Sequence, residues 1–178
     1  MFQRFIDEKI PIMIGTQMIA KGLNFENVTL VGVVSADQGL YSNDFRAGEK
    51  TFSLLAQVIG RCGRGDRPGE AVIQTFTPEN EIIRLAADQD YEAFYEEEMA
   101  YRSLCMYPPA GYMIHVLVSS DDERRALGLA TALKKRASKD VLIIGPAPDN
   151  VFKINDHYRY GIYIKGKDEK SVAASRLN

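Results

Sequence analysis

Three polar side chains in the stretch QVIGRCGRGDRPGE, residues 57–70, are spaced to point at one target. At about 100° per residue, a helix places Gln57, Arg61 and Arg64 on one narrow stripe. A helix over residues 49–63 would therefore present an amide and two guanidinium groups to an anion. The apolar residues on roughly the opposite side of that helix are Phe52, Leu55, Ala56 and Ile59.

Glycines crowd the same stretch, at Gly60, Gly63 and Gly65. Each glycine inside a helix costs about 1 kcal/mol relative to alanine, which indicates close approach of the backbone to a ligand or a neighbouring domain. Arginine can stabilise charge on a transferring phosphoryl group because its planar fork stays charged. The sequence has no GxxxxGK[ST] cradle, so the nucleotide would be held elsewhere. The alternative is a pair of ion-paired surface arginines.

Composition limits the classes of protein. The 178 residues are 46% apolar, enough for one domain or two small ones. Lys and Arg number 22 against 24 Asp and Glu, so nucleic acid would have to bind at a local basic site. Cys62 and Cys105 have no CxxC spacing, and no metal site or disulfide framework is predicted. This cysteine usage makes a reduced, cytoplasmic compartment the expectation. No apolar run reaches about 18 residues, so no membrane span is expected.

The N-terminal part has the layout of an α/β fold. A short helix over residues 2–8 precedes a buried strand over 10–14 and an apolar strand over 28–37, the latter typical of a parallel sheet covered on both faces. The helix over 49–63 and another strand over 70–76 follow. Ligands of such sheets lie beyond the carboxyl ends of the strands. The turn residues at those ends are Gly15, Thr16, Gln17 and Asp37.

The rest of the chain is predicted as helices followed by a small α+β module. Residues 78–106 are helical with a break near 88–90, and one apolar stripe faces a core: Tyr91, Phe94, Tyr95 and Met99. The order of the module is βαββα, one strand short of a split βαβ unit. Its strands are expected over 112–119 and 141–144, followed by two strands or a hairpin over 152–154 and 158–165. Its helices are expected over 121–138, capped by Ser120 or Asp121, and over 168–176.

The sequence resembles superfamily-two helicases. The stretches GTQMIAKGLNFENVTLVGVVSADQGL and QVIGRCGRGDRPG look like motifs V and VI of these motors. With DFRAGEKTF, MYPPAGY and GPAPDNVFKINDHYRYGIYIKG, they are similar to the primosomal protein N′ (PriA) family of replication-restart helicases along nearly the whole chain. The resemblance implies part of a second RecA-like lobe with a parallel sheet over residues 1–77, a helical connector over 78–109 and an incomplete α+β C-terminal domain over 110–178.

This resemblance also implies an activity. It is that of an ATP- and Mg²⁺-dependent 3′-to-5′ DNA helicase that recognises stalled or branched replication forks and promotes primosome assembly. Its partners would be forked or single-stranded DNA, other primosome proteins and single-strand-binding protein. The ATP cradle and the family's zinc-binding cysteines are not in this sequence, so we expect a fragment that does not hydrolyse ATP by itself. The alternatives are a DNA- or protein-binding module and another superfamily-two motor.

The family's site residues carry over by position. Arg61 and Arg64 would be the motif VI arginines that reach the phosphates of ATP, and Gln57 the glutamine of that motif; these are the predicted catalytic residues. The predicted cofactor-binding residues are Gly22, Asp37, Arg61 and Arg64. The predicted DNA-binding residues are Gly15, Thr16, Gln17 and Lys21 of motif V, and Arg159 of the C-terminal module.

The C-terminal module leaves two readings open. In one, its basic residues and the run Tyr158, Arg159 and Tyr160 form a DNA-binding surface on which aromatic rings stack with bases. In the other, the lysines solvate a helix end and the tyrosines pack a sheet. His115, inside a strand, is predicted to be a satisfied core residue rather than a catalytic base. The other basic residues of this surface are Arg124, Arg125, Lys134, Lys135, Arg136 and Lys153.

Overall fold

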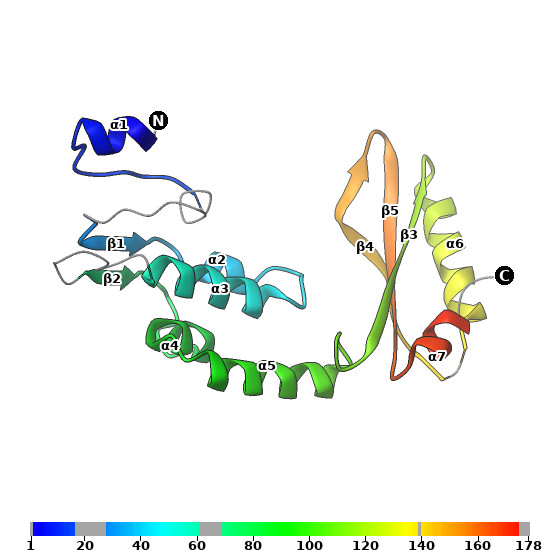
Figure 1. Cartoon of the computed structure of the whole chain (residues 1–178). Helices are drawn as coiled ribbons and strands as arrows, with labels where there is room; N and C mark the ends of the chain where they lie inside the picture. Colours follow the sequence, from blue (N-terminus) through cyan, green and yellow to red (C-terminus); the bar gives the residue numbers. More distant parts are fainter. Residues whose placement is uncertain (1, 17–27, 61–68, 139, 175–178) are drawn as a thin grey trace. The chain divides into compact units, whose positions relative to one another are not determined.

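The chain folds into two units, and each unit has its own hydrophobic core. Figure 1 labels the helices and strands of both. The computed structural model describes residues 2–16, 28–60, 69–138 and 140–174. The N-terminal unit comprises Met1–Phe94 and the C-terminal unit Tyr95–Asn178. The helix α5 begins in the first unit and continues into the second.

A parallel pair of strands and several helices make up the N-terminal unit. Strand β1, Leu30–Val33, pairs with β2, Glu70–Ile73, so that Leu30 lies opposite Glu70 and Val33 opposite Ile73. This pairing confirms the parallel sheet that the sequence predicted. The helices are α1, Phe2–Asp7; α2, Asp37–Leu40; α3, Ala47–Ile59; α4, Glu81–Asp88; and the start of α5, Tyr91–Cys105.

Helix α3 buries the predicted apolar side. Phe52 and Leu55 are 4% and 1% exposed, and Ala56 and Ile59 pack against the same core. Phe52 stacks on Phe94, with ring centroids 4.1 Å apart. The helix ends at Ile59, where the N–H of Gly60 donates to the carbonyl of Ala56. The expected continuation to residue 63 lies outside the described residues.

Two strand predictions were wrong in extent or kind. Residues 10–14 form no strand, and Ile12 and Ile14 are 72% and 92% exposed. A strand needs a neighbour for its N–H and C=O groups, and within the described part of the chain no strand pairs with this segment. The strand expected over 28–37 is only β1. Among the described residues its sheet is covered on one face, since Leu30 is 60% exposed whereas Val33 packs against the core.

The predicted break between two helices is confirmed. Helix α4 ends at Asp88, and Gln89 caps it with a left-handed backbone, φ 56°. The predicted core stripe of α5 is wrong for the tyrosines: Phe94 is 5% exposed, but Tyr91 and Tyr95 are 62% and 53% exposed. Of this stripe, only Phe94 lies within the core built by α3 and α4.

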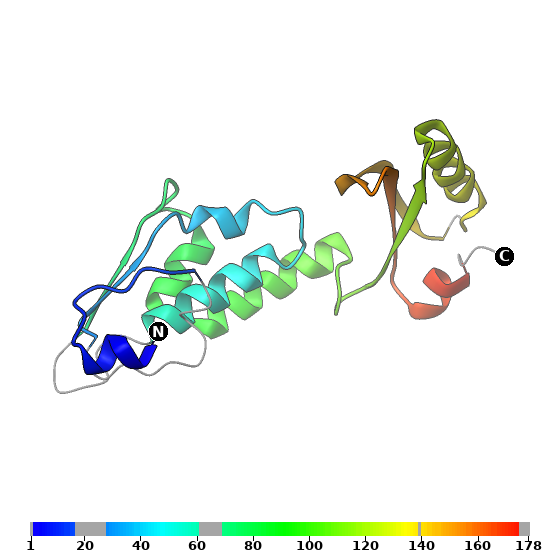
Figure 2. The ribbon, with the colours of Figure 1, turned by 90° about the horizontal axis from the view of Figure 1, so that it is seen from above.

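After the end of α5, three antiparallel strands and two helices complete the C-terminal unit in the predicted order βαββα. The elements are β3, Tyr112–Ser120; α6, Glu123–Arg136; β4, Leu142–Ile154; β5, His157–Gly166; and α7, Glu169–Ala174. The strand order is β3-β5-β4, with β5 in the centre. Both helices lie on the same side of the sheet, as the two ribbon views show (Figures 1 and 2).

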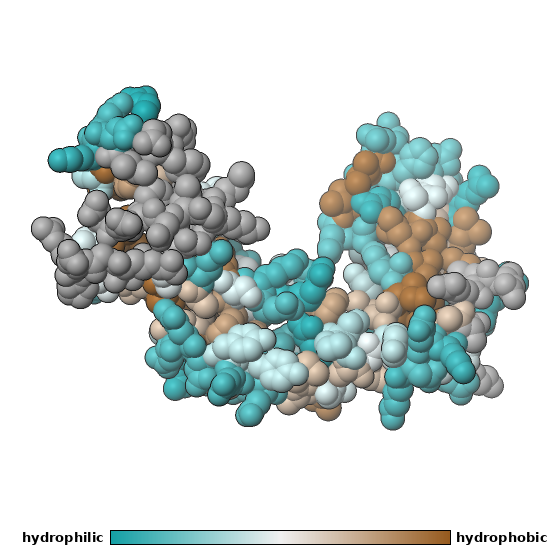
Figure 3. Space-filling model, in the orientation of Figure 1, coloured by the Kyte–Doolittle hydropathy of each residue, from teal (hydrophilic) through white to brown (hydrophobic). Residues whose placement is uncertain are grey.

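Strand alternation sets the second core. Val118 of β3 and Tyr160, Ile162 and Ile164 of β5 are buried against Ala126 and Ala130 of α6 and Val172 of α7. Apolar residues also reach the surface of this unit, where brown patches lie over the upper part of β4 and beside α6 (Figure 3).

Some local predictions for this unit were wrong. The strands expected over 141–144 and 152–154 are one strand, β4, interrupted by two irregular stretches of pairing. The cap of α6 is Asp122, whose carboxylate accepts from the N–H of Arg125 at 2.8 Å, rather than Ser120 or Asp121. His115 lies on the exposed face of β3, not in the core, because its position alternates with the partly buried Val116 and the buried Val118.

Candidate functional site

The predicted site residues fall into two groups. Arg61, Arg64, Gln17, Lys21 and Gly22 lie outside the described residues. The others are described: Gly15 and Thr16 are exposed, Gln57 is exposed on α3, Asp37 is buried at the start of α2, and Arg159 lies on β5.

Asp37 joins the carboxyl ends of the two parallel strands. One carboxylate oxygen accepts hydrogen bonds from the hydroxyls of Thr75, at 2.7 Å, and Thr77, at 2.8 Å. The other accepts from the N–H of Phe76 at 3.0 Å. At the predicted edge of the sheet, hydrogen bonds to the Asp37 carboxylate therefore connect the segments that follow the two strands.

These hydrogen bonds also set the charge of Asp37. The N–H of Phe76 and then the hydroxyl of Thr75 lower the pKa of its carboxyl group to about 2, because each donor stabilises the ionised form. The group is 8% exposed. Asp37 thus stays a carboxylate at neutral pH and holds the edge in shape.

The backbone bends sharply just before Asp37. Ser35 has φ 55°, a left-handed conformation that is uncommon outside glycine. The N–H of Gln74 donates to Val33 and the N–H of Ala36 donates to Gln74, at 2.8 and 3.0 Å, which extends the pairing beyond both strands. This bend places the Asp37 carboxylate within hydrogen-bond distance of Thr75, Phe76 and Thr77.

Thr75 and Thr77 were not among the predicted site residues. The signal in the sequence is the pair of hydroxyl residues alternating around Phe76 directly after β2, at the edge where ligands of a parallel sheet lie. Alternation places both hydroxyls on one side of the extended chain.

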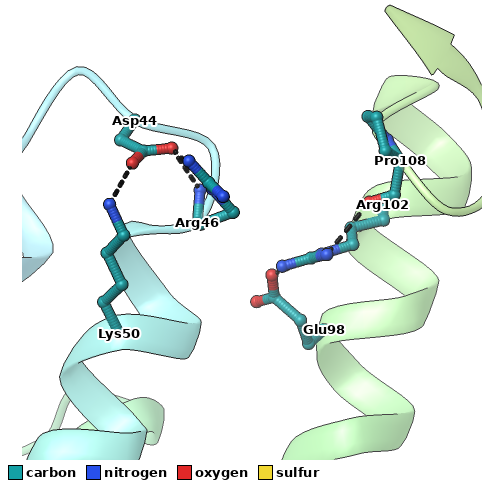
Figure 4. A network of polar contacts seen from close by, with 6 residues as sticks. All are labelled: Asp44, Arg46, Lys50, Glu98, Arg102 and Pro108. Atoms are coloured by element: carbon teal, nitrogen blue, oxygen red, sulfur yellow. Dashed lines mark hydrogen bonds and ion pairs between the residues drawn. The ribbon is translucent and has the colours of Figure 1, made fainter.

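A second polar network precedes α3 (Figure 4). The carboxylate of Asp44 accepts from the N–H of Arg46 at 3.0 Å and from the Nζ of Lys50 at 2.5 Å. The ammonium of Lys50, followed by the N–H of Arg46, lowers the pKa of Asp44 to about 2. The network fixes the loop that leads into the helix carrying Gln57.

Helix α3 therefore exposes Gln57 on one side, while its opposite side is held in the hydrophobic core. Phe52 and Leu55 bury that side, and Gln57 points to solvent immediately before residues 61–68. In chemical terms the described end of this helix can orient the amide of Gln57 towards a ligand.

A third network belongs to the C-terminal unit (Figure 4). Arg102 pairs with Glu98 at 2.7 Å and donates to the carbonyl of Pro108 at 2.9 Å, with both charged side chains nearly buried. The ammonium of Lys165, 4% exposed, donates to the carbonyl of Cys105 at 3.2 Å and lies 3.3 Å from the ring centroid of Tyr107. These contacts attach the end of α5 to the sheet.

The structure decides between the two readings of Tyr158, Arg159 and Tyr160. Tyr158 and Tyr160 point into the core, where Tyr160 is 6% exposed and its hydroxyl donates to Glu123 at 3.0 Å. Burial, and then this hydrogen bond, raise the pKa of Tyr160. The tyrosines therefore pack the sheet, and the proposed stacking of bases on them is wrong. Arg159 lies on the opposite face.

Among the described residues, no cluster of three or more His, Cys, Asp or Glu side chains could hold a metal ion. No helix in the same parts of the chain is long and apolar enough to cross a membrane.

Comparison with known proteins assigns both halves of the chain. Residues 1–66 match the family model described as the helicase conserved C-terminal domain. Residues 103–177 match the model described as the primosomal protein N C-terminal domain. The chain belongs to the PriA family. The two matches support the partial RecA-like lobe and the C-terminal domain expected from the sequence.

Individual relatives agree with this assignment. The replication restart protein PriA of Bacillus subtilis is 47% identical over 174 residues, which cover 96% of this chain and 22% of the relative. The protein of the same name from Chlamydia trachomatis is 38% identical over 188 residues, covering 99% of this chain and 25% of the relative. The chain thus spans about a quarter of the length of these PriA relatives.

Proposed function

We propose that this chain is part of an ATP-dependent 3′-to-5′ DNA helicase that recognises stalled or branched replication forks and promotes primosome assembly and replication restart. In this proposal residues 1–77 form half of the second helicase lobe, 78–109 a connector and 110–178 the C-terminal domain. The full-length protein acts in the cytoplasm with forked or single-stranded DNA, other primosome proteins and single-strand-binding protein.

The observation that carries the proposal is the orientation of α3. Its apolar side is buried, Gln57 is exposed, and the arginines at 61 and 64 follow directly in the sequence. ATP with Mg²⁺, held mainly by the other lobe, would supply the phosphoryl group. Gln57, Arg61 and Arg64 would contact its phosphates, since a guanidinium stays charged and can bind phosphate through two donors.

The remaining predicted residues support that nucleotide and the DNA strand. Asp37 would act on the nucleotide through the shape of the edge, because its oxygens already accept three hydrogen bonds. Gly22 is the other residue proposed to contribute to nucleotide binding. Backbone amides and side chains of motif V would contact DNA phosphates without reading sequence, which suits a translocating motor. Those residues are Gly15, Thr16, Gln17 and Lys21.

The test compares ATP hydrolysis by the full-length protein, with and without forked DNA, with that of two variants. Arg61→Ala removes one proposed phosphate contact, and Arg84→Ala is the matched control, since Arg84 pairs with Glu81 on the surface of α4. We expect DNA-stimulated hydrolysis to fall by about 10³-fold or more for Arg61→Ala, the scale known for arginine fingers. Unchanged hydrolysis in that variant would remove Arg61 from the site. The 178-residue chain alone is expected not to hydrolyse ATP.

A further inference from the structure

The boundary between the two units falls inside a helix. Helix α5 runs without interruption from Tyr91 to Cys105, while the first unit ends at Phe94 and the second begins at Tyr95 (Figure 1). Boundaries between compact units more often fall in exposed, flexible segments rich in glycine and proline. Neither residue type occurs in α5, and sharp kinks in helices arise almost always at such residues. The two ends of α5 are therefore parts of one continuous element.

The first turn of α5 packs on α3, the helix that leads to the proposed arginines. Phe94, 5% exposed, stacks on Phe52 of α3 with the two ring planes inclined by 10°. Tyr91 lies against the same Phe52 ring, with centroids 6.2 Å apart. Closely packed interiors are hardly compressible and transmit displacements. A movement of the first turn of α5 therefore also moves α3.

Two buried cations hold the last turn of α5 in the C-terminal unit. Arg102, 8% exposed, donates to the carbonyl of Pro108 at 2.9 Å (Figure 4). The ammonium of Lys165, on the central strand β5, donates to the carbonyl of Cys105, the last residue of the helix, and lies over the ring of Tyr107. Releasing the helix would leave this ammonium buried without these contacts, which is costly. The end of α5 therefore follows β5.

We propose that α5 couples the C-terminal unit to α3, so that forked DNA bound by the protein changes the rate of ATP hydrolysis through this helix. Phe94 is then a positioning residue, which acts on the phosphates only through the arginines at 61 and 64. The inference rests on the proposed function, because it requires those arginines to contact ATP. A fork stimulates hydrolysis in this way if it binds better to the arrangement of α5 in which the arginines reach the phosphates.

The test weakens α5 between its two anchored ends. Glu96 and Glu97 are exposed in the middle of the helix. The double variant Glu96→Gly/Glu97→Gly introduces the poorest helix former after proline. Glu96→Ala/Glu97→Ala is the matched control, because it removes the same two charges and keeps the helix.

Hydrolysis of ATP by the full-length protein is measured with and without saturating forked DNA. We expect the ratio of the two rates to fall about fivefold or more in the glycine pair, the lower end of the range for coupling between sites. The rate without DNA and the KM for ATP should stay at the wild-type values. The alanine pair should keep the wild-type ratio.

Two further measurements keep the proposal falsifiable. Tyr107→Leu removes the ring over the Lys165 ammonium and loosens the other end of α5, so it should lower the same ratio, with circular dichroism to check that each variant is folded. Coupling is reciprocal, so the factor by which a non-hydrolysable ATP analogue changes fork affinity should shrink in the glycine pair. Wild-type stimulation in both the glycine pair and Tyr107→Leu would overturn the proposal. An equal loss in the alanine pair would assign the effect to the charges and overturn it as well.

The outcomes also separate this inference from the proposed function. If Arg61→Ala abolishes hydrolysis while the glycine pair keeps the wild-type stimulation, the coupling through α5 is wrong and the proposed function stands. Unchanged hydrolysis in Arg61→Ala would remove the proposed phosphate contact, and the inference with it.

Discussion

Replacing Gly39 with alanine tests the contact between α2 and α3 that supports the candidate edge. A Cβ at position 39 would run into the Oγ1 atom of Thr51 on α3. Thr51 is 4% exposed, and its hydroxyl has no hydrogen-bond partner among the described residues. Since the same helix is fixed by Phe52 and Leu55 in the core, the clash can be relieved only by rotating Thr51 or shifting α2.

The size of the effect follows from this geometry. Overfilling a well-packed site costs about 1–3 kcal/mol, so we expect Gly39→Ala to lower the free energy of unfolding by about 2 kcal/mol. Thr51→Ala removes the obstructing hydroxyl. The double variant should therefore be more stable than the sum of the two single changes predicts, with a coupling of about 1 kcal/mol or more.

Urea unfolding followed by far-UV circular dichroism measures these differences. Gly128→Ala on α6 is the matched control, because nothing lies within 4 Å of a Cβ at that position. Removing a glycine from an unobstructed helix should raise stability by about 0.5–1 kcal/mol. The reasoning is refuted if Gly39→Ala behaves like this control, or if the effects of Gly39→Ala and Thr51→Ala simply add.

Two other predictions concern stability. Folding lowers the pKa of Asp37 from 3.8 to about 2. The stability that its carboxylate contributes is therefore fully present above the unfolded pKa and is lost as the pH falls towards 2. Asp37→Asn should flatten the loss of stability over that interval in acid titrations, and an unaltered profile would contradict the role given to the Asp37 carboxylate. Asn80 caps α4 by accepting from the N–H of Ile82 at 3.0 Å, so Asn80→Ala should cost about 1 kcal/mol in urea unfolding. A change below about 0.3 kcal/mol, the scatter expected between independent sites, would count against the cap.

Periodic features of single elements could be predicted from the sequence. The spacing of Phe52, Leu55 and Ile59 gave the buried side of α3, since that pattern depends only on the turn of a helix. The break near Asp88 and the end of α5 before Pro108 could also be predicted, because the local backbone preferences of the residues there decide both.

Features set by distant contacts could not be predicted. The pattern of Tyr158, Arg159 and Tyr160 shows that the tyrosines share a face, but only the packing of α6 and α7 decides that this face is the core. Residues 10–14 have the composition of a strand, yet pairing depends on a neighbour. The role of Thr75 and Thr77 depends on Asp37, 38 and 40 residues away in sequence.

The most direct test of the central claim is DNA-stimulated ATP hydrolysis by the full-length protein carrying Arg64→Ala, measured together with fork binding. A phosphate-contacting arginine predicts that hydrolysis is abolished while fork affinity stays nearly intact, and that Arg64→Lys restores little, because lysine keeps the charge but lacks the planar fork. Hydrolysis at the wild-type rate in Arg64→Ala would contradict the proposal that this chain completes a nucleotide site held by another lobe.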